Sequence, residues 1–411
     1  MQKFLEDSSG HRNRFFFLIY LFQGIPGGYL LVGLTLHLTS QGVSAVNIGT
    51  LAGVSSIPWM FKWLAGPYFD RRVAKGSGRR MRPIRCLSGL ILCNALLLFS
   101  IAQPELQIAW LTTLFLVHAA FAASLDVVVD GLAVEVIPEV ERGRTSAFMM
   151  SGRFVGSAIG SALLGSVLIR IGYFESVVVY LLLLLTVYLL VCSFREQTSA
   201  NRVRHSFTGV LRVSLIKIFT KRSLLALAIV CLVDVGISFA RRVLDFQFIA
   251  TGGWDPLHLS IVKGVGGAVI AIGALGIIGR MTDKKGPVRV TALVSLFFMV
   301  TYVGMIALAE HWGSAWLGFS YSALDLALRP AFQCASMPIF MALCSKEVEG
   351  TQFAIYSSIF NFADISGAFL FAHLFERVGD VVSLTICVVL IAIAIILLRV
   401  LQKMTTPAAE A

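Results

Sequence analysis

Apolar positions in this chain form long runs that are separated by short polar connections. A helix needs about 20 consecutive apolar residues to cross the hydrocarbon core of a bilayer. Runs of that length recur from one end of the chain to the other, and they predict an all-α membrane protein. The twelve predicted spans are residues 15–36, 46–67, 83–102, 107–136, 145–170, 176–195, 223–250, 259–280, 287–309, 312–343, 350–372 and 382–402.

Basic residues gather in every second connection between these spans. The N-terminal segment and the connections after even-numbered spans hold twenty-six Lys and Arg residues, whereas the connections after odd-numbered spans hold only Arg170 and Arg377. Because short loops rich in Lys and Arg stay on the cytoplasmic side, both termini are predicted to face the cytoplasm. The net charge of +11 is then explained by topology, and nucleic-acid binding is not expected.

The composition excludes several other classes of protein. The chain is 57% hydrophobic and only 14% charged, with a mean hydropathy of +0.82. Soluble domains carry about 25% charged residues, so the composition excludes a soluble globular protein. The seven cysteines show no paired CxxC spacing, so neither a disulfide framework nor a zinc site is expected. No phosphate-binding loop, nucleophile elbow or HExxH motif occurs, and we therefore expect no enzyme activity and no cofactor.

The chain divides into two similar halves. Its longest polar connection predicts a cytoplasmic linker at 196–222, between six-span bundles at 1–195 and 223–411. The stretch 66–71 (Gly-Pro-Tyr-Phe-Asp-Arg) is similar to 279–284 (Gly-Arg-Met-Thr-Asp-Lys), and a Val-Glu pair precedes both span five and span eleven. A parallel repeat of this kind is typical of secondary transporters whose binding site lies between two bundles.

The first repeated loop carries a family signature. Gly66, Asp70 and Arg71, followed by Gly-Arg-Arg at 78–80, resemble the loop motif of the major facilitator superfamily. The resemblance implies two pseudo-symmetric six-helix bundles that work by alternating access. In such a loop the glycine permits close helix approach. We therefore expect Gly66, Asp70, Arg71 and Asp283 to govern opening and closing rather than substrate choice.

Five charged residues lie within the spans of the first half, where charges are costly unless they serve a function, and three of them, Lys62, Asp130 and Arg153, are expected at similar depth. Asp126 and Asp130 are four residues apart on one helical face, and Glu135 lies one further turn toward the cytoplasm. Lys62 and Arg153 either lock these carboxylates in place or leave one of them to take up a proton with the substrate. We expect Asp126, as the deepest and the furthest from the basic partners, to be the proton site.

The second half also carries charges within its spans. Arg241 and Arg242 are successive, so the sequence predicts that only one of them reaches the cavity as an anion clamp. Asp325 and Arg329 have the spacing of an intrahelical pair, and Asp364 is expected to be an interface partner rather than a substrate ligand. The candidate cavity residues are Gln23, Tyr29, Asp234, Arg241, Tyr321, Asp325, Arg329 and Gln333.

Span one contains a proline among three glycines at 24–28 (Gly-Ile-Pro-Gly-Gly). Such a segment loosens a helix and exposes backbone carbonyls near a transport site. It equally permits close packing of two helices through small residues. Both interpretations stay open from the sequence.

A narrower resemblance is carried by four stretches of the chain. The segment 57–71 (Ile-Pro-Trp-Met-Phe-Lys-Trp-Leu-Ala-Gly-Pro-Tyr-Phe-Asp-Arg) resembles the AmpG-type branch of the superfamily. Residues 126–143, the connection around 342–354 and the opening segment at 24–28 are similar to it as well. Members of this branch move anhydromuropeptides, acetyl-CoA or siderophores (the RhtX/FptX type), and the compact length of this chain is closest to the siderophore permeases.

This resemblance implies proton-coupled import across a bacterial inner membrane. A ferric siderophore is the first expected substrate and an anhydromuropeptide the second. An exporter of drugs or other amphiphiles with the same fold is a further alternative. The expected partners are a small-molecule substrate, protons and the lipid bilayer, with the protein acting as a monomer.

Overall fold

The structure, a computed structural model, describes residues 3–75, 80–197, 206–250, 253 and 266–405. The chain folds into two compact units that exchange short segments. Unit 1 comprises Met1–Pro138, Phe148–Leu215 and Cys344–Ser358. Unit 2 comprises Glu139–Ala147, Ile216–Leu343 and Ile359–Ala411. Each unit therefore contains one short segment from the half of the sequence that otherwise builds the other unit.

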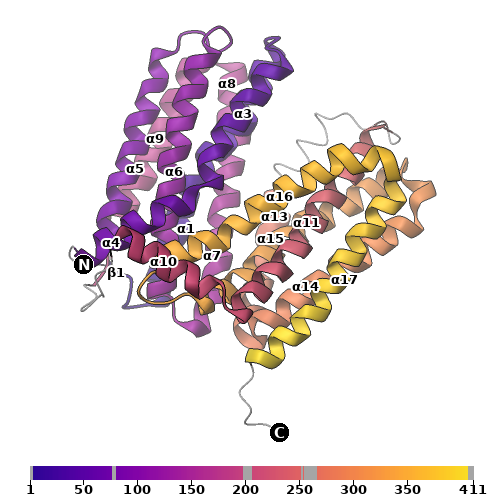
Figure 1. Cartoon of the computed structure of the whole chain (residues 1–411). Helices are drawn as coiled ribbons and strands as arrows, with labels where there is room; N and C mark the ends of the chain where they lie inside the picture. The colour runs from indigo at the N-terminus through magenta and orange to yellow at the C-terminus, as the bar shows by residue number, and fades with distance from the viewer. Residues whose placement is uncertain (1–2, 76–79, 198–205, 251–252, 254–265, 406–411) are drawn as a thin grey trace. The chain divides into compact units, whose positions relative to one another are not determined.

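Unit 1 is built almost entirely of helices (Figure 1). Its elements in chain order are β1 (Lys3–Phe4), α1 (Ser9–Gly28), the π-helix η1 (Tyr29–Gly33), α2 (Leu34–Ser40), α3 (Ala45–Met60), the 3-10 turn η2 (Lys62–Ala65), α4 (Gly66–Lys75), α5 (Met81–Leu96), the 3-10 turn η3 (Leu97–Ser100), α6 (Ile108–Val136), most of α7 (Arg142–Ala158), the π-helix η5 (Ile159–Leu164), α8 (Gly165–Arg170), α9 (Tyr173–Cys192), β2 (Phe194–Arg195) and most of α10 (Phe207–Ile218).

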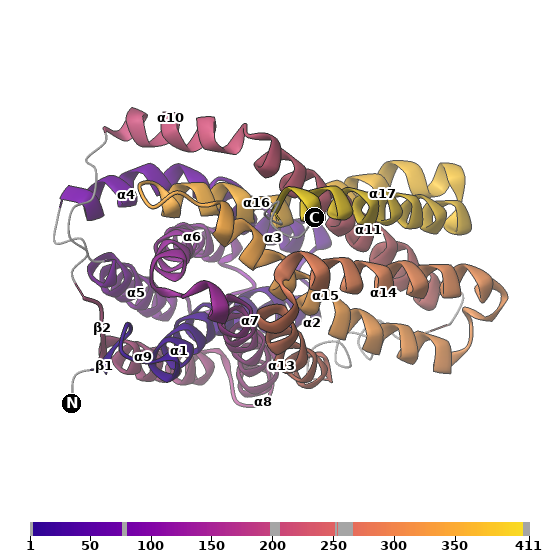
Figure 2. The ribbon, with the colours of Figure 1, turned by 90° about the horizontal axis from the view of Figure 1, so that it is seen from below.

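Unit 2 is helical throughout its described residues. Its elements are the 3-10 turn η4 (Glu139–Glu141), α11 (Lys221–Ala250), α13 (Gly267–Lys285), α14 (Pro287–Ala307), the 3-10 turn η7 (Ala309–His311), α15 (Ala315–Leu343), most of α16 (Glu349–Val378) and α17 (Asp380–Thr405). Helix α14 contacts both α15 and α17, while α11 lies along α17 and α13 along α15 (Figure 2).

The all-α membrane fold predicted from the apolar runs is confirmed. Nine segments of the described residues are long and apolar enough to cross a bilayer. The first predicted span is interrupted by the π-helix η1, and the second breaks where α3 ends after Pro58. The eighth begins with residues outside the described part of the chain. Large side chains such as Ile277, Phe297 and Ile396 are exposed, as lipid-facing residues of a membrane helix would be.

Two glycine-rich helix faces meet in unit 1. A Cβ atom added at Gly24 or Gly28 of α1 would collide with backbone atoms of Arg153 or Ser157 on α7. Glycines on α7 and η5 have the same relation to α1, and Gly160 for example faces the carbonyl of Ile25. Helix α1 continues through Pro26 to Gly28. The structure therefore favours close packing over an unwound helix for the segment 24–28.

Candidate functional site

A buried lysine lies between two carboxylates in unit 1. Helix α3 contains Pro58 and ends at Met60, and Lys62 begins the 3-10 turn that follows. From there Lys62 Nζ lies 2.7 Å from Asp126 Oδ2 and 3.7 Å from Asp130 Oδ2, both on helix α6. All three side chains are buried. One cation thus serves two carboxylates that lie one helical turn apart.

Tyr20 completes this cluster from helix α1. Its hydroxyl donates a hydrogen bond of 2.6 Å to Asp130 Oδ1, and the side chain is fully buried. Sequence analysis did not identify Tyr20, because a single tyrosine in an apolar run carries no positional signal. We call Tyr20, Lys62, Asp126 and Asp130 the lysine cluster.

Three expectations about these charges need correction. Asp126 is not the carboxylate furthest from a cation but the one closest to Lys62, because the break after Met60 and the length of the lysine side chain bring Nζ to it. Arg153 is exposed, and its guanidinium lies 5.8 Å from the ring centroid of Trp59 instead of pairing with a described carboxylate. Glu135 faces a different arginine.

That arginine, Arg80, lies at the start of α5 and is completely buried. Its guanidinium donates to Asp70 Oδ1 at 2.8 Å and to Glu349 Oε1 at 3.3 Å, and its Nε lies 3.4 Å from Glu135 Oε2. Burial alone would lower the pKa of Arg80, but the charges of Asp70, Glu349 and Glu135 outweigh it and raise the pKa above its ordinary value. Arg80 is therefore a permanent cation among three carboxylates.

Asp70 also holds the first turn of helix α16. Its Oδ2 accepts hydrogen bonds from the Thr351 backbone N–H at 2.8 Å and from the Thr351 hydroxyl at 2.7 Å. A Cβ at Gly66 would lie 2.6 Å from Thr351 Cα, so only glycine allows this approach. The sequence marked Glu349 only as part of the repeated Val-Glu pair and Thr351 only within the stretch 342–354, and it predicted no contact of either residue with Asp70 or Arg80. Arg71 is exposed, and Gly78 and Arg79 lie outside the described residues.

Unit 2 contains the second copy of this arrangement. Asp283 Oδ1 accepts a hydrogen bond of 2.8 Å from the Gly143 backbone N–H, and the Arg144 N–H donates to the same carboxylate at 3.2 Å. Burial raises the pKa of Asp283, and these two hydrogen bonds oppose that rise. A Cβ at Gly279 would lie 2.9 Å from the carbonyl oxygen of Gly143. The repeat seen in the sequence thus forms two similar contacts between an aspartate and a helix start.

The second half of the chain brings three arginines onto one carboxylate. Arg242 donates from both terminal nitrogens to Asp364, at 3.3 and 3.2 Å, and Arg329 donates to Asp364 Oδ1 at 3.2 Å. Arg241 lies 3.6 Å from the same oxygen, and the Ser238 hydroxyl donates to it at 2.9 Å. We call Arg241, Arg242, Arg329 and Asp364 the arginine cluster. Its side chains are 23–38% exposed, so the cluster is open to a ligand.

The arginine cluster corrects one further expectation. Arg241 and Arg242 both reach Asp364, because two long side chains converge although their Cα atoms face different directions. Arg329 lies within electrostatic range of Asp325 on its own helix, in line with the predicted pair, and it also donates to Asp364 on α16. Asp364 pairs with arginines of two other helices, α11 and α15.

The remaining cavity candidates are distributed differently from expectation. Tyr29 is fully buried in unit 1, bonded to Ser176 at 2.6 Å and stacked on Tyr180, so it belongs to the packing core. Asp234 is fully buried in α11, and neither of its oxygens accepts a hydrogen bond from a described residue. The others are buried or half-buried side chains on α1 and α15, namely Gln23, Tyr321, Asp325 and Gln333.

Known proteins share this fold and parts of this sequence. The family model described as Major Facilitator Superfamily matches residues 16–368. The anhydromuropeptide permease of Escherichia coli (strain K12) is 24% identical over 348 residues, which cover 82% of this chain and 68% of that protein. The multidrug resistance protein MdtG of Dickeya zeae (strain Ech586) is 23% identical over 352 residues, covering 84% of this chain and 82% of that protein. The solved structure of the human organic anion transporter MFSD10 (TETRAN) has a TM-score of 0.74 at 14% identity, with 95% and 100% of the two chains covered.

Proposed function

Because the chain belongs to the major facilitator superfamily and is a membrane transporter of that fold, we propose that it imports a medium-sized anionic solute together with protons. The arginine cluster is the observation that carries the proposal. Three partly exposed guanidinium groups gather there around Asp364, and Asp234 and Asp325 lie within electrostatic range of Arg329. Charged side chains inside membrane spans mark substrate pathways, and guanidinium groups that remain accessible favour an anionic substrate.

Arg241 is the residue of this cluster best placed to bind the solute. Arg242 and Arg329 donate hydrogen bonds to Asp364, while Arg241 has only an ion pair of 3.6 Å with a described residue. Guanidinium groups bind carboxylates and phosphates through two parallel hydrogen bonds. Arg241 therefore retains donors for an anionic substrate, while its two neighbours hold Asp364 in place.

An anhydromuropeptide, whose peptide carries carboxylates, is the first candidate substrate. The relatives named as anhydromuropeptide permease and as AmpG transporters support it, and they support the AmpG-like branch. A ferric siderophore with acidic groups fits the same charge and is the second candidate. The distribution of Lys and Arg supports a location in the bacterial inner membrane with both termini in the cytoplasm, and the proposal treats the protein as a monomer.

Uptake into proteoliposomes tests the substrate and the role of Arg241 together. With an inward proton gradient, the wild-type protein accumulates the labelled anhydromuropeptide or the ferric siderophore. The change Arg241→Gln raises the KM about tenfold, as the loss of about 1.4 kcal/mol of binding would. Arg280→Gln removes a charge from an exposed site and leaves the KM unchanged. Folded wild-type protein that accumulates neither compound contradicts the proposal.

The lysine cluster supplies a site for the coupled proton. Two buried carboxylates share Lys62 as their ion-pair partner, and a bound proton would reduce the negative charge that is buried there. Because Lys62 pairs with both carboxylates, at 2.7 and 3.7 Å, we assign the coupled proton to the pair rather than to one residue.

Exchange experiments test this coupling. Asp126→Asn and Asp130→Asn should each abolish uphill uptake while leaving exchange of labelled for unlabelled substrate, because exchange needs no net proton movement. Uphill uptake that survives both substitutions would rule out the lysine cluster as the coupling site.

The two aspartate contacts fit a role in alternating access. Asp70 holds the first turn of α16 and Asp283 the first turn of α7, and the rest of each of these helices belongs to the other unit. Each contact lies within one unit and holds the first turn of a helix whose larger part belongs to the other unit. Gly66→Val should slow transport without changing substrate affinity, because a side chain there collides with Thr351.

Export of amphiphiles is a second candidate, favoured by the relative named multidrug resistance protein. The arginine cluster distinguishes the two functions, because a cationic drug would be repelled by three guanidinium groups. Cells that lose this protein should take up less of the anionic nutrient and keep their drug sensitivity. Increased drug sensitivity with unaltered uptake would favour the exporter.

A further inference from the structure

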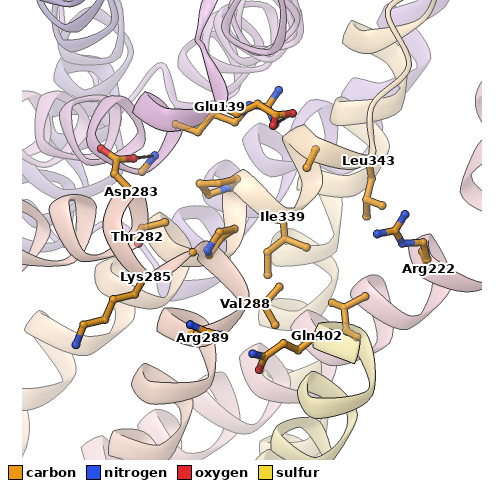
Figure 3. A pocket seen from close by; sticks show the side chains of 17 residues that line it. Glu139, Arg222, Thr282, Asp283, Lys285, Val288, Arg289, Ile339, Leu343 and Gln402 are labelled. Atoms are coloured by element: carbon orange, nitrogen blue, oxygen red, sulfur yellow. Dashed lines mark hydrogen bonds and ion pairs between the residues drawn. The ribbon is translucent and has the colours of Figure 1, made fainter. Parts of the chain in front are cut away.

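A cavity lies at one end of unit 2, and its lining includes no residue of either cluster. Its volume is about 380 Å³, and it is enclosed by the ends of α11, α13, α14, α15 and α17 with the turn before α7 (Figure 3). The distribution of basic residues predicts that these ends face the cytoplasm. The volume falls in the range of small-molecule pockets, about 300–1,000 Å³.

The cavity combines an apolar floor with guanidinium groups at its margin. Val288, Ile339 and Leu343 supply the floor (Figure 3). Arg222 lies beside Leu343 on one side, and Arg289 lies on the side of Val288 and Gln402 (Figure 3). Lys285 points away from the centre, so it contributes charge at longer range only.

Neither guanidinium has a protein partner among the described residues. Arg222 and Arg289 are exposed, and no hydrogen bond or ion pair joins either of them to another described side chain. The two carboxylates of the cavity are already engaged, because Asp283 binds the Gly143 and Arg144 N–H groups and Glu139 pairs with Arg142 at 3.3 Å. The positive charge at the margin is therefore available to a ligand.

We propose that this cavity binds a phosphate ester, with Arg222 and Arg289 on the phosphate and the organic part on the apolar floor. A guanidinium binds two oxygens of a phosphate through parallel hydrogen bonds, and Arg222 and Arg289 each offer such a group at the margin of the cavity. The start of α14, which has no side-chain cap, adds its dipole on the same side. The ester is either the headgroup of an anionic phospholipid or a soluble phosphorylated metabolite.

Two probes on the purified full-length protein distinguish these sources. Native mass spectrometry measures retention of phosphatidylglycerol against phosphatidylcholine after reconstitution at equal amounts. Binding of a soluble phosphate is measured by titrating the protein in detergent with glycerol 3-phosphate and recording the rise in its unfolding temperature. Whichever probe the wild-type protein binds, the double variant Arg222→Gln with Arg289→Gln should bind it at least fivefold more weakly. Lys284→Gln with Lys403→Gln removes equal charge from exposed positions that do not line the cavity.

Each result has a definite meaning. Preferential retention of phosphatidylglycerol that only the cavity variant loses supports the phospholipid headgroup. Binding of glycerol 3-phosphate that only the cavity variant loses supports a soluble ester. Equal behaviour of the cavity and control variants, or a folded wild-type protein that prefers neither probe, overturns the proposal.

Discussion

The two charged clusters within the membrane region differ in sign and in access. The lysine cluster in unit 1 sets one cation against two carboxylates, and its three charged side chains are at most 6% exposed. The arginine cluster in unit 2 sets three cations against one carboxylate, and its side chains are 23–38% exposed. The first site is closed and holds more carboxylates than lysines, whereas the second is open and presents three guanidinium groups.

This difference suggests a division of labour between the units. We propose that the closed site takes up the coupled proton, which is small enough to enter without a cavity. The open site, with its three guanidinium groups, is then the proposed binding place of a larger anion. The proposed symport thus needs no residue that binds both the proton and the solute, and the two functions should be separable by mutation.

The largest effect is expected from Lys62→Ala. Without the lysine, Asp126 and Asp130 remain buried with no cation, and breaking a buried pair in this way costs about 3–5 kcal/mol. The unfolding temperature in detergent should fall markedly, and uptake should be lost with it.

A double variant tests whether charge is the cause. Lys62→Met with Asp126→Asn removes both charges of the shorter ion pair and leaves Asp130 bonded to Tyr20. It should recover most of the lost stability and still fail in uphill transport. If the Lys62→Ala protein were as stable as wild type, Lys62 would not stabilise the two buried carboxylates, and the proposed difference between the two clusters would be wrong.

The arginine cluster predicts a smaller effect on stability that differs among its members. Arg242 makes two hydrogen bonds to Asp364, Arg329 one, and Arg241 only the longer ion pair. Changes to Gln should therefore lower stability in that order, by about 1–2 kcal/mol at most because the pairs are partly exposed. Thermal unfolding of the three variants measures the order.

The effect on KM should follow the reverse order. Arg241→Gln, the least destabilising of the three, should raise the KM most, because its guanidinium is least engaged by the protein. If all three variants lost stability and affinity in parallel, the distinction between a binding arginine and supporting arginines would fail.

The all-α membrane fold could be predicted from the sequence, because membrane-spanning helices appear in it as long apolar runs. Apolar runs and the bias of Lys and Arg depend on no tertiary contact. The repeat of Asp70 and Asp283 was also visible, and both residues make the same kind of contact in the structure. What could not be foreseen is the exchange of short segments, by which Glu349 and Thr351 join unit 1.

The site was anticipated only in its charged members. Lys62, Asp126 and Asp130 stood out because charges are rare in membrane spans. Which carboxylate lies closest to Lys62 depends on the end of helix α3 at Met60. The position of the lysine after that break cannot be calculated from residue spacing along a regular helix. Arg241 and Arg242 were predicted to point in different directions because they are successive on a helix. Both reach Asp364 nevertheless, because an arginine side chain is long.

Tyr20→Phe should have an effect of intermediate size confined to the lysine cluster. It removes one hydrogen bond to a buried carboxylate, worth about 1.5–3 kcal/mol for a charged partner. If Asp130 shares the coupled proton, the pH dependence of uptake should shift while the KM for the solute stays unchanged. A changed KM with an unshifted pH profile would link Tyr20 to the solute site instead.

The smallest effect on transport is expected from Glu196→Gln. The titration of Glu196 has to be distinguished from that of the carboxylates proposed to couple proton and solute transport. Glu196 follows β2 outside both clusters and is buried, with its Oε2 accepting a hydrogen bond of 2.9 Å from the Met81 N–H. Burial raises the pKa of Glu196 from its ordinary value of 4.5 to about 7, against the opposing effect of that hydrogen bond. This carboxyl group therefore titrates in the pH range in which proton-coupled uptake would be measured.

The sign of its contribution follows from proton linkage. Between pH 4.5 and about 7 the folded protein holds this proton and the unfolded chain does not, so the free energy of unfolding falls as the pH rises through that window and is level above it. Glu196→Gln should abolish this part of the pH dependence, a change of a few degrees or less in unfolding temperature. Uptake and its pH profile should stay as in wild type. If the variant altered the pH profile of uptake while the lysine cluster was intact, proton coupling would have to be assigned to the region of Glu196.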